Sequence, residues 1–362
     1  MGPHHGRRAA LRSSLQAAEL DALLVTDLLN VRYLTGFTGS NAALLIAADG
    51  DDTSVFCTDG RYDTQSGHQV PDLKRVIDRQ CDLTMAAAAA DAGYTRLGFE
   101  SHRVTVDRHA ALAATAPTVE LVRAPGMAES LRLVKDDAEV EALRMACAAA
   151  DRALADLIAH GGLRPGRTER EVARELEDRM LDHGAAGRSF ESIVATGANS
   201  AVPHHRPTDA ELCSGDFVKL DFGALVDGYH SDMTRTFVLG EPADWQREIY
   251  QLVAAAQAAG RAALKPGADV RDVDAAARDV IQQAGHGDDF VHGLGHGVGL
   301  EIHEAPTLSR LGDGKLAAGM AVTVEPGVYL AGRGGVRIED TLVVRDTAPE
   351  LLTLTTKDLV VV

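Results

Sequence analysis

The last two thirds of the chain repeat one order of elements, in which two helices are followed by strands. Apolar residues at a spacing near 3.6 predict the helices, and alternating apolar residues predict the strands. The predicted helices span residues 136–159, 168–183, 245–264 and 270–284, and the strands lie around 217–224, 236–239, 321–324 and 335–344. We interpret this order as an internal duplication.

Capping patterns fix where the first two of these helices begin. Asp136 precedes Glu139 by three residues, and Thr168 precedes Glu171 in the same way. In such a capping box each side chain accepts a hydrogen bond from the other residue's backbone N–H, which satisfies donors at the helix start.

The first third has a different pattern, typical of an α/β domain. Short apolar runs predict strands, and alanine-rich or amphipathic stretches predict helices between them. The strands are expected at 21–25, 42–47, 53–58 and 97–100, and the helices at 9–20 and 85–92. The turn Ala124-Pro125-Gly126 is the best candidate for a boundary. We therefore predict two domains, residues 1–126 and 127–362.

Charge and cysteine content exclude several classes of protein. The 362 residues carry 36 basic and 53 acidic side chains, a net charge of −17. That balance argues against binding nucleic acids or anionic membranes, which need a basic surface. The four cysteines form no C-x-x-C pair, no apolar run is long enough to span a membrane, and the N-terminus lacks the apolar core of a secretory signal. A cytoplasmic protein is expected.

Five polar residues lie in strand-like or glycine-rich contexts where polar groups are unusual. A single acidic residue in a strand is more often an edge or ion-paired residue, and a single loop histidine is unremarkable. A carboxylate inside a sheet is costly unless it is paired or binds a metal. Together and in this order the five predict a site, and they are Asp221, Asp232, His296, Glu325 and Glu339.

Four carboxylates and one imidazole form a hard, oxygen-rich ligand set. Such a set favours Mn²⁺ over a thiolate-type zinc site. Converging carboxylates repel one another, and two divalent ions would cancel that charge; two-metal sites activate water and polarise carbonyls. His296 follows His292 by four residues, but the glycines at 293, 295, 297 and 299 predict an irregular loop rather than a helical zinc motif. The same glycine run lacks the lysine of a phosphate-binding loop.

The surrounding residues resemble those of the dinuclear metallopeptidases with the pita-bread fold, which include methionine aminopeptidase, aminopeptidase P and prolidase. Within this group, the sequence motifs are most similar to those of the Xaa-Pro peptidases. The similar segments are 295–304 (GHGVGLEIHE), 324–329 (VEPGVY), 335–341 (GVRIEDT) and 131–135 (LRLVK). Residues 30–37 (NVRYLTGF) and 58–62 (TDGRY) resemble the creatinase-type N-terminal domain of that family. The resemblance therefore covers nearly the whole chain.

The resemblance implies a fold and a metal site. The expected fold is a creatinase-type mixed-sheet α/β domain, followed by an α+β pita-bread catalytic domain with a curved antiparallel sheet over two helix pairs. It implies two divalent ions, with Mn²⁺ expected and Co²⁺ or Zn²⁺ as alternatives. Asp221 would bind one ion, His296 and Glu325 the second, and Asp232 and Glu339 would bridge both.

The resemblance also implies catalytic roles. Glu325 would shuttle a proton, and His303 would donate a hydrogen bond to the scissile carbonyl. His204, with His205 as the alternative, and His292 would shape the proline pocket. Arg337 would pair with the site carboxylates and hold Asp232 or Glu339 in place.

The implied activity is hydrolysis of the N-terminal Xaa-Pro bond of short proline-containing peptides, by a homodimer. Some prolidases carry an arginine directly after their Glu-x-Pro stretch, whereas here Glu304-Ala305-Pro306 is followed by Thr307 and the next arginine is Arg310. This difference favours activity on longer peptides as well as dipeptides. A methionine aminopeptidase, a creatinase-like hydrolase without metal, and a non-catalytic binding module are the alternatives.

Overall fold

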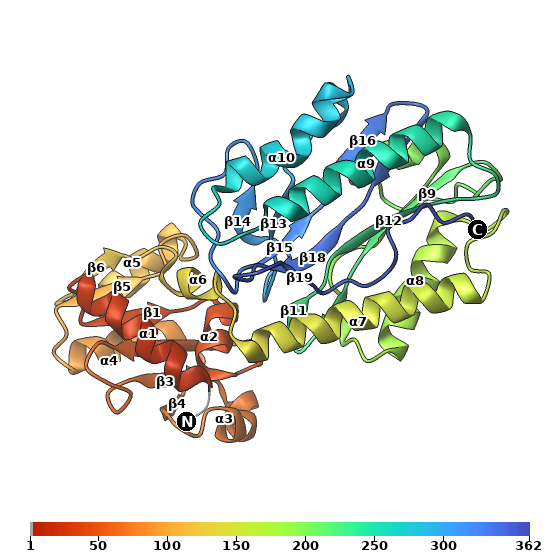
Figure 1. The fold of residues 1–362 in the computed structure, drawn as a ribbon. Coiled ribbons are helices and arrows are strands. Elements are labelled where there is room, and N and C mark those ends of the chain that lie inside the picture. The colour runs from red at the N-terminus through yellow and green to blue at the C-terminus, as the bar shows by residue number, and fades with distance from the viewer. Residues whose placement is uncertain (1–2) are drawn as a thin grey trace. The chain divides into compact units, whose positions relative to one another are not determined.

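The computed structural model describes residues 3–362 and divides into two compact units. The first unit ends at Arg132 and the second begins at Leu133. Met1 and Gly2, with which the first predicted domain begins, lie outside the described residues. Figure 1 shows the helices and strands of each unit along the chain.

The first unit is an α/β domain around one mixed sheet of six strands, in the order β4-β3-β2-β1-β5-β6. β1 pairs antiparallel with β2 and parallel with β5, so the mixed sheet that the sequence predicted is confirmed. Its strands are β1 (Ala22–Val25), β2 (Ala42–Ala47), β3 (Val55–Thr58), β4 (Lys74–Ile77), β5 (Arg96–Phe99) and β6 (Glu120–Arg123). Its helices are α1 (Pro3–Ala17), α2 (Leu28–Thr35), α3 (Asp63–Gln69), α4 (Cys81–Asp91), α5 (Val106–Thr115) and α6 (Met127–Arg132), with the 3₁₀ turn η1 (Gly60–Tyr62).

The first unit extends six residues beyond the predicted boundary, because α6 packs within it. The guanidinium of Arg132 donates to Asn30 Oδ1 at 3.1 Å, and the hydroxyl of Tyr33 donates to the carbonyl of Leu131 at 3.2 Å. The turn at residues 124–126 therefore precedes the last helix of the unit.

The second unit contains two helix pairs and several short antiparallel sheets. Its helices are α7 (Asp137–Ala159), α8 (Glu169–Asp182), α9 (Asp244–Ala263) and α10 (Val270–Gln283), with the 3₁₀ turns η2 (Gly197–Ala201) and η3 (Gly287–Asp289). The strands of its first half are β7 (Gly187–Arg188), β8 (Ile193–Thr196), β9 (Phe217–Phe222), β10 (Ala224–Val226), β11 (Tyr229–His230) and β12 (Met233–Val238). Those of its second half are β13 (Gly295–Gly297), β14 (Glu304–Leu308), β15 (Ala321–Val324), β16 (Gly327–Leu330), β17 (Gly334–Arg337), β18 (Asp340–Val343) and β19 (Glu350–Leu351).

The second unit repeats the order of two helices followed by strands, as predicted, and each helix pair packs into a separate hydrophobic cluster. In the first half, buried residues of α7 and α8 pack against β8, β9 and β12. In the second half, buried residues of α9 and α10 pack mainly against β14 to β18. The strand orders are β12-β9-β8 and β11-β10-β7 in the first half, and β14-β13-β15-β18-β19 and β16-β17 in the second.

The predicted helix starts are confirmed. The Asp136 side chain accepts from Glu139 N at 2.9 Å, and Glu139 accepts in return from Asp136 N at 3.0 Å. Thr168 and Glu171 form the same reciprocal pair at the start of α8. Each cap contributes about 1 kcal/mol to stability.

The glycine-rich segment is more ordered than predicted, because residues 295–297 form strand β13 where an irregular loop was expected. A Cβ on Gly295 would lie 2.1 Å from the carbonyl oxygen of Thr323, and one on Gly297 would lie 2.1 Å from that of Ala305. These glycines therefore allow the strands on both sides to approach closely. The irregular-loop prediction was wrong for this stretch because it considered only the flexibility of glycine.

Two further expectations concern cysteines and membrane spans. Cys57, Cys81 and Cys147 are buried and Cys213 is exposed, and all four are free thiols. Among the described residues, no helix is both long and apolar enough to cross a membrane.

Replacing Gly297 with alanine should destabilise the second unit by about 1–3 kcal/mol, because the new methyl group overlaps the backbone of β14. Gly187→Ala is the matched control, since nothing lies within 4 Å of a Cβ at that position. Urea unfolding of both variants measures the difference. Equal stability of the two variants would contradict the close approach at β13.

Candidate metal centre

Strands β9 and β12 bring the two predicted aspartates together. The apolar residues of β9 pack against α7 and α8, so Lys219 and Asp221 point to the opposite face of the strand. Thr234 of β12 lies opposite Asp221 in the antiparallel register. Asp232, one residue before β12, therefore lies beside Asp221.

The other half of the unit supplies the remaining three predicted ligands. His296 lies in β13, and Glu325 directly follows β15. The stretch 335–344, expected to be continuous, is interrupted between β17 and β18, and Glu339 lies in that break. The backbone N–H of Glu339 donates to the carbonyl of Thr234 at 3.1 Å, which ties the two halves together at the site.

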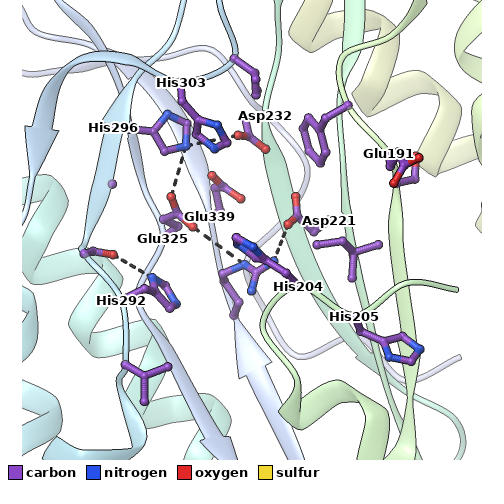
Figure 2. Close-up of a pocket in the computed structure, with 18 of the residues that line it drawn as sticks. Glu191, His204, His205, Asp221, Asp232, His292, His296, His303, Glu325 and Glu339 are labelled. Atoms are coloured by element: carbon purple, nitrogen blue, oxygen red, sulfur yellow. Dashed lines mark hydrogen bonds and ion pairs between the residues drawn. The ribbon is translucent and has the colours of Figure 1, made fainter.

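The five side chains converge on one cavity, as Figure 2 shows. Ligand atoms of Asp232, His296 and Glu339 all lie within 4.8 Å of one another. His296 Nε2 lies 3.5 Å from Asp232 Oδ2 and 3.4 Å from Glu325 Oε1. The structure thus brings together all five residues that the sequence predicted as metal ligands.

The electrostatics of this cluster fit divalent cations. One buried oxygen in each of Asp221, Asp232 and Glu339 has no hydrogen-bond partner among the described residues. Burial, reinforced by the neighbouring carboxylates, raises the pKa of Asp232 and of Glu339 well above the usual range. Burial also raises the pKa of Glu325. Unpaired buried oxygens that face one another are what a metal site requires before its ions bind.

Arg337 contacts these carboxylates differently from the expectation. Its guanidinium pairs with a carboxylate of the site, as expected, but that carboxylate is Asp221, whereas Asp232 or Glu339 was the residue that it was expected to hold in place. It reaches Glu339 indirectly, because Arg337 Nε donates to Thr234 Oγ1 at 3.0 Å and that hydroxyl donates to Glu339 Oε2 at 2.6 Å. The strand register explains the difference, since Thr234 is the residue opposite Asp221.

Tyr329 joins this network, although no role was assigned to it from the sequence. Its hydroxyl accepts from Arg337 Nη1 at 2.8 Å and lies 2.8 Å from His292 Nε2. His292 Nδ1 lies 2.8 Å from the carbonyl of Gly293, so Nδ1 carries the hydrogen and Nε2 accepts from Tyr329. Burial, with Arg337 second, lowers the pKa of His292 to about 3. Tyr329 could have been found from the sequence, because it ends the Glu-Pro-Gly-Val-Tyr stretch that carried the family resemblance.

The two candidate substrate histidines have different surroundings. His204 lies beside Asp221 and the carboxylate cluster in Figure 2, whereas His205 points away from it. His205 Nε2 lies 2.8 Å from Glu169 Oε2, a partner that accounts for its orientation. His303 stacks edge-on to His296, with ring centroids 4.4 Å apart.

Lys219 is a second residue that the sequence reasoning missed. It is fully buried on the same face of β9 as Asp221, and burial followed by Arg337 lowers its pKa well below the usual range. The cost of burying this charge is offset by three hydrogen bonds that the ammonium group donates to backbone carbonyls, those of Ser200, Val202 and Pro203. A lysine within an otherwise apolar strand is unusual, and this could have marked Lys219 from the sequence.

The cavity has a volume of about 1440 Å³ and is larger than the metal cluster alone needs. His204, His292 and His303 line it together with the five predicted ligands. Arg174 of α8 and Arg310, which follows β14, also line it, and both are exposed. Within the described part of the chain, neither guanidinium has an ion-pair partner.

Comparisons with known proteins cover both units. The family model described as metallopeptidase family M24 matches residues 141–346, and that of the creatinase/prolidase N-terminal domain matches residues 7–134. The uncharacterized peptidase YqhT of Bacillus subtilis is 41% identical over 353 residues, which cover 97% of this chain and 98% of that protein. The structure of a Xaa-Pro dipeptidase from Bacillus anthracis matches with a TM-score of 0.94 at 40% identity, covering 99% of this chain and 100% of that one. An X-Pro aminopeptidase structure from Thermotoga maritima matches with a TM-score of 0.89 at 32% identity, covering 97% and 100%.

Asp232→Asn should stabilise the metal-free protein, because it removes a carboxylate that is buried among other carboxylates. A gain of roughly 1 kcal/mol would raise Tm by about 2–4 °C in a unit of this size. The control is Asp340→Asn, which should cost about 3–5 kcal/mol, since Asp340 is buried against Arg235 and Lys357. Thermal unfolding of chelator-treated protein at pH 8 measures both, and a comparable loss of Tm in the two variants would refute the like-charge cluster.

His292 should remain neutral from pH 8 down to pH 5, because its pKa is about 3. The unfolded chain binds this proton near pH 6.5, so the residue makes the folded state less stable as the pH falls below that value. Nitrogen-15 NMR of labelled histidine side chains measures the titration. A midpoint near 6.5 for His292 would contradict the bonding to Tyr329 and Gly293.

Proposed function

The chain belongs to metallopeptidase family M24, and from this premise we propose that it is a dinuclear-metal exopeptidase that hydrolyses the N-terminal Xaa-Pro bond of peptides. One observation carries the proposal: Asp221, Asp232, His296, Glu325 and Glu339 converge in one cavity. Three of them, Asp221, Asp232 and Glu339, each have a buried oxygen without a hydrogen-bond partner among the described residues. The Xaa-Pro dipeptidase and X-Pro aminopeptidase structures that this chain resembles over nearly its whole length support the substrate class.

The five converging residues would hold the two ions. Asp221 would bind one ion, His296 and Glu325 the other, and Asp232 and Glu339 would bridge them. We propose Mn²⁺, because four carboxylates and one imidazole form a hard ligand set; Co²⁺ and Zn²⁺ are alternatives. When bound, such ions supply an activated water and polarise a carbonyl oxygen.

The chain's own residues move the protons and orient the peptide. The nitrogen of an Xaa-Pro bond carries no hydrogen, so the leaving proline must receive a proton. Glu325, half-buried at the centre of the cluster, is the proposed carrier of that proton. His303 would donate a hydrogen bond to the scissile carbonyl oxygen, where negative charge develops. His204 and neutral His292 would form the walls of the proline pocket.

The size of the cavity favours substrates longer than a dipeptide. Small-molecule pockets measure about 300–1,000 Å³, whereas this cavity measures about 1440 Å³. Arg174 and Arg310 lie exposed along its wall without ion-pair partners in the described residues, and would attract the carboxylate end of a peptide. We therefore propose that the enzyme cleaves both Xaa-Pro dipeptides and longer Xaa-Pro peptides.

The alternatives have less support. A methionine aminopeptidase usually lacks the N-terminal domain that matches here over residues 7–134. A non-catalytic module, like a creatinase-like hydrolase without metal, has no need for five converging ligands. We further propose that the enzyme is a cytoplasmic homodimer; its free thiols suit a reducing compartment, and its family resemblance suggests the dimer.

Replacing Glu325 with glutamine should lower kcat for Ala-Pro-Ala by about 10²–10⁴-fold, the usual contribution of a positioned proton carrier. Glu191→Gln is the matched control, because Glu191 lines the same cavity but pairs with Arg206 at 3.6 Å. The control should retain activity within about twofold. Turnover is measured on Mn²⁺-loaded protein, with metal content determined in parallel. Full activity of the Glu325 variant would contradict its assigned role.

Three substrates separate the candidate activities, assayed on metal-stripped protein with and without added Mn²⁺. Mn²⁺-dependent cleavage of Ala-Pro and of Ala-Pro-Ala at the Ala–Pro bond is the expected result. Cleavage of Ala-Pro alone would indicate a strict dipeptidase. Cleavage of Met-Ala-Ser alone would indicate a methionine aminopeptidase. No cleavage of any substrate by metal-loaded protein would favour the binding module.

A further inference from the structure

His204 lines the cavity beside the carboxylate cluster. It follows turn η2 in an irregular stretch, and its imidazole is exposed and makes no hydrogen bond to any described residue. We call residues 196–208 the His204 segment. A side chain without hydrogen bonds of its own depends for its position on the segment that carries it.

On one side, a buried cation holds the carbonyl oxygens of this segment. Lys219 Nζ donates to Val202 O at 2.7 Å, to Ser200 O at 3.1 Å and to Pro203 O at 3.4 Å. Arg337 Nη1 adds a bond to Pro203 O at 3.2 Å. An ammonium group has three hydrogens, and all three therefore point into the His204 segment.

On the other side, a buried anion holds the N–H groups of the segment. Glu169, the first residue of α8, is completely buried. Its Oε1 accepts from Thr196 N and from Asn199 Nδ2, both at 2.9 Å. Its Oε2 accepts from His205 Nε2 at 2.8 Å and from Thr208 N and Oγ1 at 2.8 and 2.7 Å. One carboxylate thus joins both ends of the segment and the residue next to His204.

We propose that Glu169 and Lys219 are positioning residues that clamp the His204 segment between opposite buried charges and so fix the His204 imidazole in the cavity. The inference rests on the proposed function only in that His204 acts on the substrate. The two charges are complementary to the backbone, since the carboxylate binds N–H groups and the ammonium binds carbonyl oxygens.

The burial of these charges argues that they serve more than stability. A buried charge is costly unless it is fully hydrogen-bonded, and apolar residues of similar volume often stabilise a protein as well. Neither side chain contacts solvent to any measurable extent. What these charges provide, and apolar residues would not, is a set of directed bonds to a segment that has no regular secondary structure beyond the short turn η2 and the last residue of β8.

Glu169→Gln tests the clamp, because an amide turns one acceptor oxygen into a donor that faces other donors. Misplacement of a contacting group by about 1 Å can cost on the order of 100-fold in rate. We expect kcat/KM to fall about 10- to 100-fold. The loss should be shared between kcat and KM in the same proportion as the loss caused by His204→Ala. Metal content should not change. Glu175→Gln, on the same helix and paired with Arg167 and Arg179, is the matched control and should retain activity.

A double-mutant cycle separates positioning from general damage. If Glu169 acts through His204, adding Glu169→Gln to His204→Ala should change kcat/KM by less than about twofold. An equal loss in both backgrounds would overturn the proposal. Thr208→Val removes one of the five bonds to Glu169, together with the bond that the Ala210 N–H donates to the same hydroxyl. It replaces Glu169→Gln in the cycle if that variant does not fold.

Hydrogen exchange provides a readout that does not depend on activity. The Thr196 and Thr208 amides should exchange at least about tenfold faster in Glu169→Gln, and in Lys219→Met, than in the wild type. Unchanged protection in both variants would overturn the clamp even if the enzyme is active. An inactive wild-type enzyme would instead refute the proposed function, while the exchange result would still decide the clamp.

Discussion

Mutual repulsion among four carboxylates is the constraint on which the rest of the second unit depends. Asp221, Asp232 and Glu339 are buried and Glu325 is half-buried, and they share one cavity with His296. The raised pKa values of Asp232 and Glu339 show that this arrangement disfavours their charged forms. Bound cations would offset that cost, and the guanidinium of Arg337 provides only one positive charge.

The duplicated architecture provides the rigidity that such a site requires. Each half contributes ligands from strand ends whose opposite faces pack on a helix pair, so the ligands cannot move apart to relieve their repulsion. A hydrogen-bond network runs from His292 through Tyr329, Arg337 and Thr234 to Glu339, and so joins His292 to the carboxylate cluster. The bonds of Glu169 and Lys219 to the His204 segment extend the same support to a loop.

The sequence predicted features that depend on local signals, and missed those that depend on pairing across the fold. Capping boxes marked α7 and α8, and acidic residues in apolar strands marked the carboxylates that converge in the cavity. The partner of Arg337 could not be predicted, because it depends on the register that places Thr234 opposite Asp221. Glu169 reaches residues up to 39 positions away, which no local pattern reveals. Strand β13 was missed because close approach of neighbouring backbones, rather than turn formation, accounts for its glycines.

Anomalous X-ray diffraction from Mn²⁺-loaded crystals would show where this carboxylate cluster binds metal ions and how many it holds. We expect two manganese peaks in each chain, both in contact with Asp232 and Glu339, one also bound by Asp221 and the other by His296 and Glu325. A single peak, or peaks that lie away from these five residues, would contradict a dinuclear site built from the carboxylate cluster.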